Sequence, residues 1–239
     1  YDSSPFIRGN TITGNSAFIG GGIHMDNSSP VIEGNVIIEN RAEMGGGIAI
    51  NINSLPIITG NTVSQNRAAR IGGGIVVAGG SAPSIRENTI AGNAAGRNGG
   101  GLLIEESEPV VDGNTIAHNM AANGGGIFIA LSLNRPLMII NNMINGNRAL
   151  NDGGGLFVLD SSLTIEGNSF IDNIAESSGG GMAVFNSAPR IIANIFENNR
   201  AGEQAGGGAI WVSADSVLEL NDPDDNTYLL NTPGDFHHE

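Results

Sequence analysis

The sequence PIITGNTVSQNRAARIGGGIVV, residues 56–77, is the clearest copy of a unit that recurs along the whole chain. It contains two asparagines five residues apart and a glycine triplet. The triplet recurs every 25 to 29 residues, beginning at Gly20, Gly45, Gly72, Gly99, Gly124, Gly153, Gly179 and Gly206. The asparagine pair marks nine repeats: Asn10/Asn15, Asn35/Asn40, Asn61/Asn66, Asn88/Asn93, Asn114/Asn119, Asn142/Asn147, Asn168/Asn173, Asn194/Asn199 and Asn226/Asn231. Self-similarity at this period is typical of a solenoid.

Two further columns keep phase with these markers. A proline stands five residues before the first asparagine at Pro5, Pro30, Pro56, Pro83, Pro109 and Pro189, and six before it at Pro136. An alanine stands two residues after the second asparagine at Ala17, Ala42, Ala68, Ala95, Ala121, Ala149, Ala175 and Ala201. Four columns in phase over the whole chain define its architecture.

Each unit contains three short apolar stretches that alternate with period two and are rich in β-branched residues. Glycine, proline, asparagine and serine interrupt them, which is the signature of strands, and no segment has a helical period. The sequence therefore predicts an all-β fold, a single-stranded right-handed parallel β-helix of about nine coils of ~26 residues with three strands each. We expect the β-helix to cover residues 1–220, and residues 221–239 to form an irregular last coil and tail.

The columns predict a role for each residue type. Ile58, Ile85, Val111, Ile116 and Ile139 should face inward, stack and be almost fully buried. The asparagines should lie at bends in the left-handed conformation and form hydrogen-bonded ladders between coils. The glycine triplet should provide positive φ or close approach of backbone.

Composition excludes several classes of function. The 239 residues carry a net charge of −14, and all ten basic residues are arginines. A chain with so many carboxylates is a poor partner for nucleic acid or an anionic membrane. There is no apolar stretch long enough for a membrane-spanning segment, and the absence of cysteine excludes disulfides and thiolate metal sites. We expect an extracellular, cell-surface or periplasmic protein.

The repeats resemble those of the right-handed parallel β-helix proteins of the pectin-lyase-like superfamily. The finer resemblance is to the GGxI and FxxN repeats of polymorphic outer-membrane proteins and autotransporter passenger domains. Gly46-Gly47-Ile48 matches the first element, and Phe170–Asn173 and Phe196–Asn199 match the second. The resemblance implies the fold over essentially the whole chain, but this architecture carries lyases, hydrolases, epimerases and adhesin stalks alike.

The strand after the glycine triplet is the face on which related β-helix enzymes keep their catalytic groups. Its outward positions offer only isolated acids, whereas a hydrolase needs two or three grouped carboxylates and a lyase needs a positioned base. We therefore expect no catalytic site. If the chain is nevertheless a polysaccharide lyase or glycoside hydrolase, the best candidates are His24 with Asp26, or Glu105 with its neighbours Glu106 and Glu108.

The same outward position forms an apolar line at Val76, Leu103, Phe128 and Phe157. Strand alternation predicts that these side chains point away from the core. An exposed apolar line of this length marks a contact surface. We therefore expect it to bind a protein partner, a neighbouring copy of the chain, or a glycan.

Two other surface columns have simpler interpretations. Threonine follows the first asparagine in several coils, but Val36, Met143 and Ile195 interrupt that column, so β-propensity explains it better than ice binding. Arginine follows the second asparagine at Arg41, Arg67, Arg148 and Arg200. We expect these arginines to form weak surface ion pairs with acids such as Glu39, Asp172 and Glu197.

The densest acidic cluster lies in the last unit, at Asp222, Asp224 and Asp225. Carboxylate oxygens suit calcium, although the spacing is not that of an EF-hand. The sequence therefore predicts a possible calcium site and no other cofactor. The function that these observations favour is a non-catalytic, surface-exposed or secreted scaffold, structural or adhesive. The alternative is a carbohydrate-active enzyme or glycan-binding module.

Overall fold

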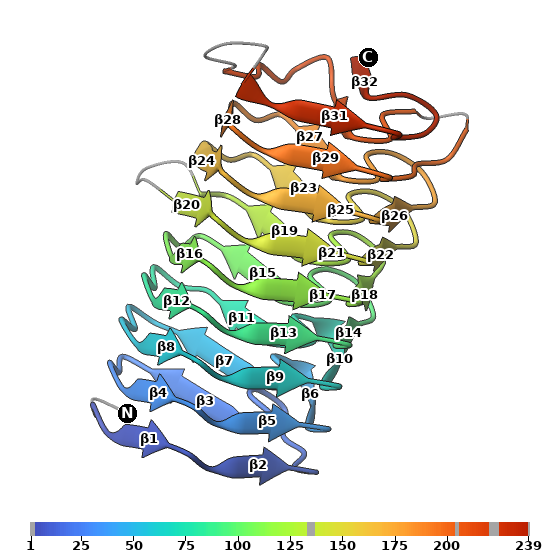
Figure 1. The fold of residues 1–239 in the computed structure, drawn as a ribbon. Coiled ribbons are helices and arrows are strands. Elements are labelled where there is room, and N and C mark those ends of the chain that lie inside the picture. Colours follow the sequence, from blue (N-terminus) through green and yellow to red (C-terminus); the bar gives the residue numbers. More distant parts are fainter. Residues whose placement is uncertain (1–2, 133–136, 204–205, 220–224, 239) are drawn as a thin grey trace.

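The computed structural model describes residues 3–132, 137–203, 206–219 and 225–238. In this part of the chain every regular element is a strand, and all strand pairs are parallel. The strands stack coil upon coil into a rod with the N-terminus at one end and the C-terminus at the other (Figure 1). The predicted parallel β-helix of about nine coils is confirmed.

Four sheets run along the rod, and two of them follow the proline and the first asparagine. Sheet A contains β1 (Phe6–Arg8), β4 (Val31–Glu33), β8 (Ile57–Thr59), β12 (Ser84–Arg86), β16 (Val110–Asp112), β20 (Leu137–Ile140), β24 (Leu163–Glu166) and β28 (Arg190–Ile192). Sheet B contains β2 (Thr11–Thr13), β5 (Val36–Ile38), β9 (Thr62–Ser64), β13 (Thr89–Ala91), β17 (Thr115–Ala117), β21 (Met143–Asn145), β25 (Ser169–Ile171), β29 (Ile195–Glu197) and β31 (Thr227–Leu229).

The other two sheets lie on either side of the glycine triplet. Sheet C contains the short strands β6 (Arg41–Met44), β10 (Arg67–Ile71), β14 (Ala94–Ala95), β18 (Met120–Ala121), β22 (Arg148–Ala149) and β26 (Ile174–Ala175). Sheet D contains β3 (Ile23–Asp26), β7 (Ile48–Asn51), β11 (Ile75–Val77), β15 (Leu102–Glu105), β19 (Ile127–Ala130), β23 (Leu156–Leu159), β27 (Met182–Phe185), β30 (Ile210–Val212) and β32 (Phe236–His238). Sheet C is a fourth strand position, so the prediction of three strands per coil was wrong where these short strands form.

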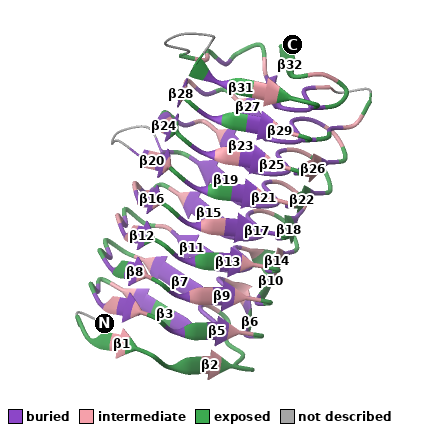
Figure 2. Cartoon of the chain, viewed as in Figure 1, coloured by how far each residue is buried: buried purple, intermediate pink, exposed green. Residues whose placement is uncertain are grey.

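The core fills the inside of the rod, and exposed residues gather at the bends and outer faces (Figure 2). Ile58, Ile85, Val111, Ile116 and Ile139 are all 0 % exposed, as predicted. Burying one such side chain is worth roughly 2 kcal/mol or more, so the stacked column is a main source of stability.

The predicted asparagine ladders are present at both bends beside sheet B. The backbone N–H of Asn61 donates to Oδ1 of Asn88 in the next coil at 2.9 Å. The Asn61 carboxamide nitrogen donates to the same oxygen at 3.0 Å and to the Ile32 carbonyl of the preceding coil at 2.8 Å. Each buried carboxamide therefore satisfies its own groups and those of its neighbours, which removes the cost of burying it.

The left-handed conformation, however, is not adopted by the ladder asparagines themselves. It belongs to the residue just before them, as at Glu39 (φ 58°), Gln65 (φ 54°) and His118 (φ 55°). The ladder asparagines are therefore explained by their carboxamides: the predicted ladder is confirmed, and the predicted left-handed conformation at these residues was wrong.

The last coil still adds strands to the rod. β31 pairs with β29, and β32 pairs with β30. Because residues 220–224 lie outside the described part of the chain, the division at residue 220 stays a prediction.

Candidate functional site

The predicted apolar stripe lies in one line on the outer face of sheet D. Val76 pairs with Leu103, Leu103 with Phe128, and Phe128 with Phe157. The four side chains form an apolar cluster separate from the main core, so they do point away from the lumen. They are nevertheless at most 7 % exposed. The expectation that this stripe is open to solvent was wrong.

The chain covers the stripe with its own backbone. A Cβ built on Gly72 would lie 2.1 Å from Cγ2 of Val76, and one built on Gly99 would lie 2.8 Å from Cβ of Leu103. The first glycine of the triplet, at positive φ, therefore lies directly over the outward side chain four residues later. The residue must be glycine because any side chain would collide with the stripe.

Aromatic rings extend this buried line toward the C-terminal end of the rod. The ring centroids of Phe128 and Phe157 are 5.1 Å apart, those of Phe157 and Phe185 5.0 Å, and those of Phe185 and Trp211 4.5 Å. In the coil after Phe157 the stripe position is occupied by Ala183, whose side chain is small. The ring of Phe185, two residues later, continues the line of aromatic rings there. The sequence interpretation missed Trp211 because the last glycine triplet is shifted by one residue relative to β30.

The candidate catalytic residues do not converge. His24 Nε2 lies 3.1 Å from Asp26 Oδ1 and 3.3 Å from Asn51 Nδ2, so the imidazole is held in a small polar group. Glu105 is on β15, three strands along sheet D from β3, which places it roughly 14 Å away at the strand spacing. The two alternative groups therefore lie apart on sheet D, and neither supplies a missing acid or base to the other.

The candidate calcium site falls mostly outside the described residues. Asp222 and Asp224 belong to the segment 220–224, and Asp225 is exposed just before the ladder residue Asn226. The calcium site therefore stays a prediction.

A third ladder was overlooked in the sequence. Buried serines stack at the bend between sheets D and A, where Ser54 N–H donates to Ser81 Oγ at 3.1 Å. The members are Ser28, Ser54, Ser81, Ser107, Ser132, Ser161, Ser187 and Ser216. In five coils the serine stands two residues before the proline column, and that spacing could have revealed it. Like the asparagines, the serines belong to the scaffold because every coil repeats them.

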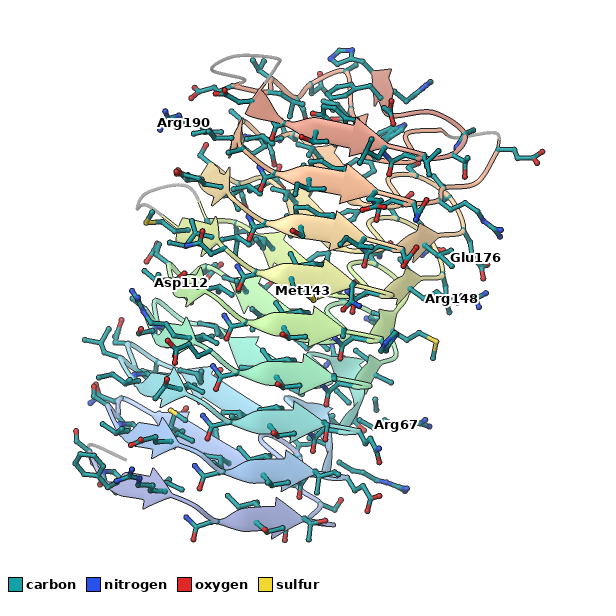
Figure 3. All side chains as sticks on the ribbon, in the orientation of Figure 1. Arg67, Asp112, Met143, Arg148, Glu176 and Arg190 are labelled. Atoms are coloured by element: carbon teal, nitrogen blue, oxygen red, sulfur yellow. The ribbon has the colours of Figure 1, made fainter. Side chains whose placement is uncertain are left out.

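The arginine column lies along sheet C, at one edge of the rod. Figure 3 shows Arg67 and Arg148 projecting from this edge, with Glu176 beside Arg148. Salt bridges in the described part of the chain join Arg8 to Glu33, His24 to Asp26, Arg86 to Asp112 and Arg148 to Glu176. The predicted pairings with Glu39, Asp172 and Glu197 are not among them. Arg41 and Arg67 are exposed and form none of these ion pairs.

Two open grooves meet at Arg41 and Arg67. The first, of about 790 Å³, is polar and is lined by Gly14, Asn15, Ser16, Glu39, Arg41, Gln65 and Arg67. The second, of about 400 Å³, has an apolar floor and is lined by Arg41, Ala42, Arg67, Ala68, Ala69, Ala94, Ala95, Gly96 and Met120. The two arginines therefore stand between a polar and an apolar depression on the same edge.

A family model for NosD, described as a periplasmic copper-binding protein, matches residues 8–221. The chain belongs to the NosD family. No curated protein and no solved structure matches it. The periplasmic description of the family agrees with the predicted location outside the cytoplasm. Its match over nearly the whole β-helix also agrees with the resemblance to β-helix repeat proteins.

The residues that the structure describes in this NosD-family chain do not fit a copper site. Copper sites are built from histidine, cysteine and methionine ligands, and the chain has no cysteine. Its described residues contain no cluster of three histidine, aspartate or glutamate side chains. The exposed thioethers of Met120 and Met143 belong to different sheets. The copper binding in the family description therefore has no counterpart in the described donor groups.

Within the described ranges, no helix has the length and apolar character needed to cross a bilayer.

Proposed function

We propose that this NosD-family chain is a non-catalytic periplasmic scaffold, a rigid β-helix whose outer surface serves for binding. The observation that supports this proposal is the apolar stripe from Val76 to Phe157, which fills the outer face of sheet D where related β-helix enzymes keep their catalytic groups. The two alternative candidate groups cannot combine across it, because Asp26 and Glu105 are three strands apart, roughly 14 Å, whereas glycosidases hold their two carboxyl groups about 5–9.5 Å apart.

The protein partner or neighbouring copy predicted from the sequence needs another surface. The stripe from Val76 to Phe157 is closed by the chain itself, so it has little area left to bury against a partner. The rest of the outer surface, including the sheet C edge, remains available. An adhesive role is compatible with this scaffold and stays part of the proposal.

An activity assay tests the proposal. Purified protein is incubated with acidic and neutral polysaccharides, and new reducing ends and unsaturated products are measured. We expect no turnover, with or without added calcium. Sustained turnover that disappears in Asp26→Ala or in Glu105→Ala would refute the non-catalytic role and favour the alternative, a carbohydrate-active enzyme.

A further inference from the structure

The arginine column contains one position where the chain supplies its own counter-ion. Arg148 directly follows the ladder residue Asn147, and its guanidinium pairs with Glu176 in the next coil. Glu176 stands three residues after the equivalent ladder residue, Asn173. The repeat therefore defines a slot, three residues after the second asparagine, from which a carboxylate reaches the arginine of the preceding coil.

In the coils that follow Arg41 and Arg67, the same slot carries no charged residue. It is occupied by Ala69 above Arg41 and by Gly96 above Arg67. Both small residues line the apolar groove beside these arginines. Arg41 and Arg67 are in register on neighbouring strands, so their Cα atoms are separated by roughly the strand spacing of 4.8 Å. Like charges this close destabilise each other unless an anion lies between them.

We propose that Arg41 and Arg67 bind successive carboxylates of an extended acidic glycan that lies along the sheet C edge. Each carboxylate would take the place that Glu176 occupies over Arg148. An arginine can hold a carboxylate through two parallel hydrogen bonds, which gives both strength and direction. The strand spacing is close to the length of one sugar ring in an extended chain, so neighbouring coils can engage neighbouring uronate residues.

The lining of the two grooves favours a glycan over other polyanions. On one side of the arginines, Asn15 and Gln65 offer carboxamides to sugar hydroxyls, and the Glu39 carboxylate can accept from hydroxyls there. Ala69, Ala94 and Met120 are the accessible apolar side chains on the other side, where the carbon face of a ring can lie. Duplex DNA carries one charge per ~1.7 Å, and a protein with a net charge of −14 repels so dense a polyanion. This inference rests on the proposed scaffold role and adds its ligand.

Binding of polygalacturonate, measured by isothermal titration calorimetry, tests the site. We expect Arg41→Gln and Arg67→Gln each to weaken binding about tenfold, because each removes one charge-assisted contact. We expect a similar loss in Ala69→Glu, which restores the internal counter-ion for Arg41 and leaves both arginines in place. Ala69 is exposed, so this change tests charge rather than folding.

Arg148→Gln is the matched control, because Arg148 occupies the same column but is already neutralised. Its affinity should equal that of the unchanged protein, and circular dichroism should show all variants folded. Failure of polygalacturonate to bind, or unchanged affinity in Ala69→Glu, would overturn the site. Equal affinity for poly-glutamate or duplex DNA would overturn the choice of a glycan. Cleavage of polygalacturonate would refute the non-catalytic role and leave the binding site standing.

Discussion

Replacing Phe157 by alanine distinguishes a buried structural stripe from an open contact surface. Phe157 is 7 % exposed and stacks between Phe128 and Phe185, with centroid distances of 5.1 and 5.0 Å. Truncating a buried phenylalanine costs about 3–5 kcal/mol, and two stacked neighbours place this position within that range. We therefore expect Phe157→Ala to lower the free energy of unfolding by about 3–5 kcal/mol.

The assay is urea unfolding followed by the fluorescence of Trp211. This residue is the only tryptophan of the chain, and its ring packs at a tilt against Phe185 at the end of the same line. Phe6→Ala is the matched control, because Phe6 is 76 % exposed and its loss should cost less than about 0.5 kcal/mol. A cost below about 1 kcal/mol for Phe157→Ala, together with weakened self-association, would show that the stripe is a surface after all.

Three further outcomes are expected. Asn93→Ala should destabilise the fold by about 2–4 kcal/mol in urea unfolding because it leaves the Asn66 N–H and the Val63 carbonyl without their ladder partner, whereas the exposed Asn151→Ala should cost little. Burial and the charge of Asp235 raise the pKa of Tyr228 from 10.0 to about 12. The stability that the neutral phenol contributes should therefore be complete below pH 10 and be lost as the pH rises toward 12. The Tyr228→Phe variant should not show this pH dependence. Calorimetric titration with Cu(I) and Cu(II) should show no tight site, and tight binding that is abolished by His24→Ala would contradict the reasoning from the donor set.

The sequence alone predicted the fold because each column obeys a simple physical rule. Ile58 and Ile85 had to be inside because alternation left them no other face, and both are fully buried. The asparagine ladders followed from stacking equal residues at the strand spacing. These inferences need only periodicity, and they survive small errors in the position of each bend.

Inferences that depended on the path of a bend were less secure. Alternation placed Phe128 outside the lumen, but it could not show that the backbone returns over it through Gly124. A one-residue shift in the last triplet likewise concealed Trp211. The conformation at the bends was assigned to the asparagines, although the residue before each asparagine adopts it. Such details require the three-dimensional course of the turn, which residue types alone do not determine.

In a fold made of repeated columns, function is best sought where one coil departs from the others. The two asparagine ladders and the serine ladder run through almost every coil and explain stability rather than recognition. The arginine column is different, because Arg148 has an internal carboxylate and Arg41 and Arg67 do not. Ala69 stands in the slot that Glu176 fills four coils later. The single substitution Ala69→Glu should therefore weaken binding about tenfold and leave the rod intact, which separates the site from the scaffold.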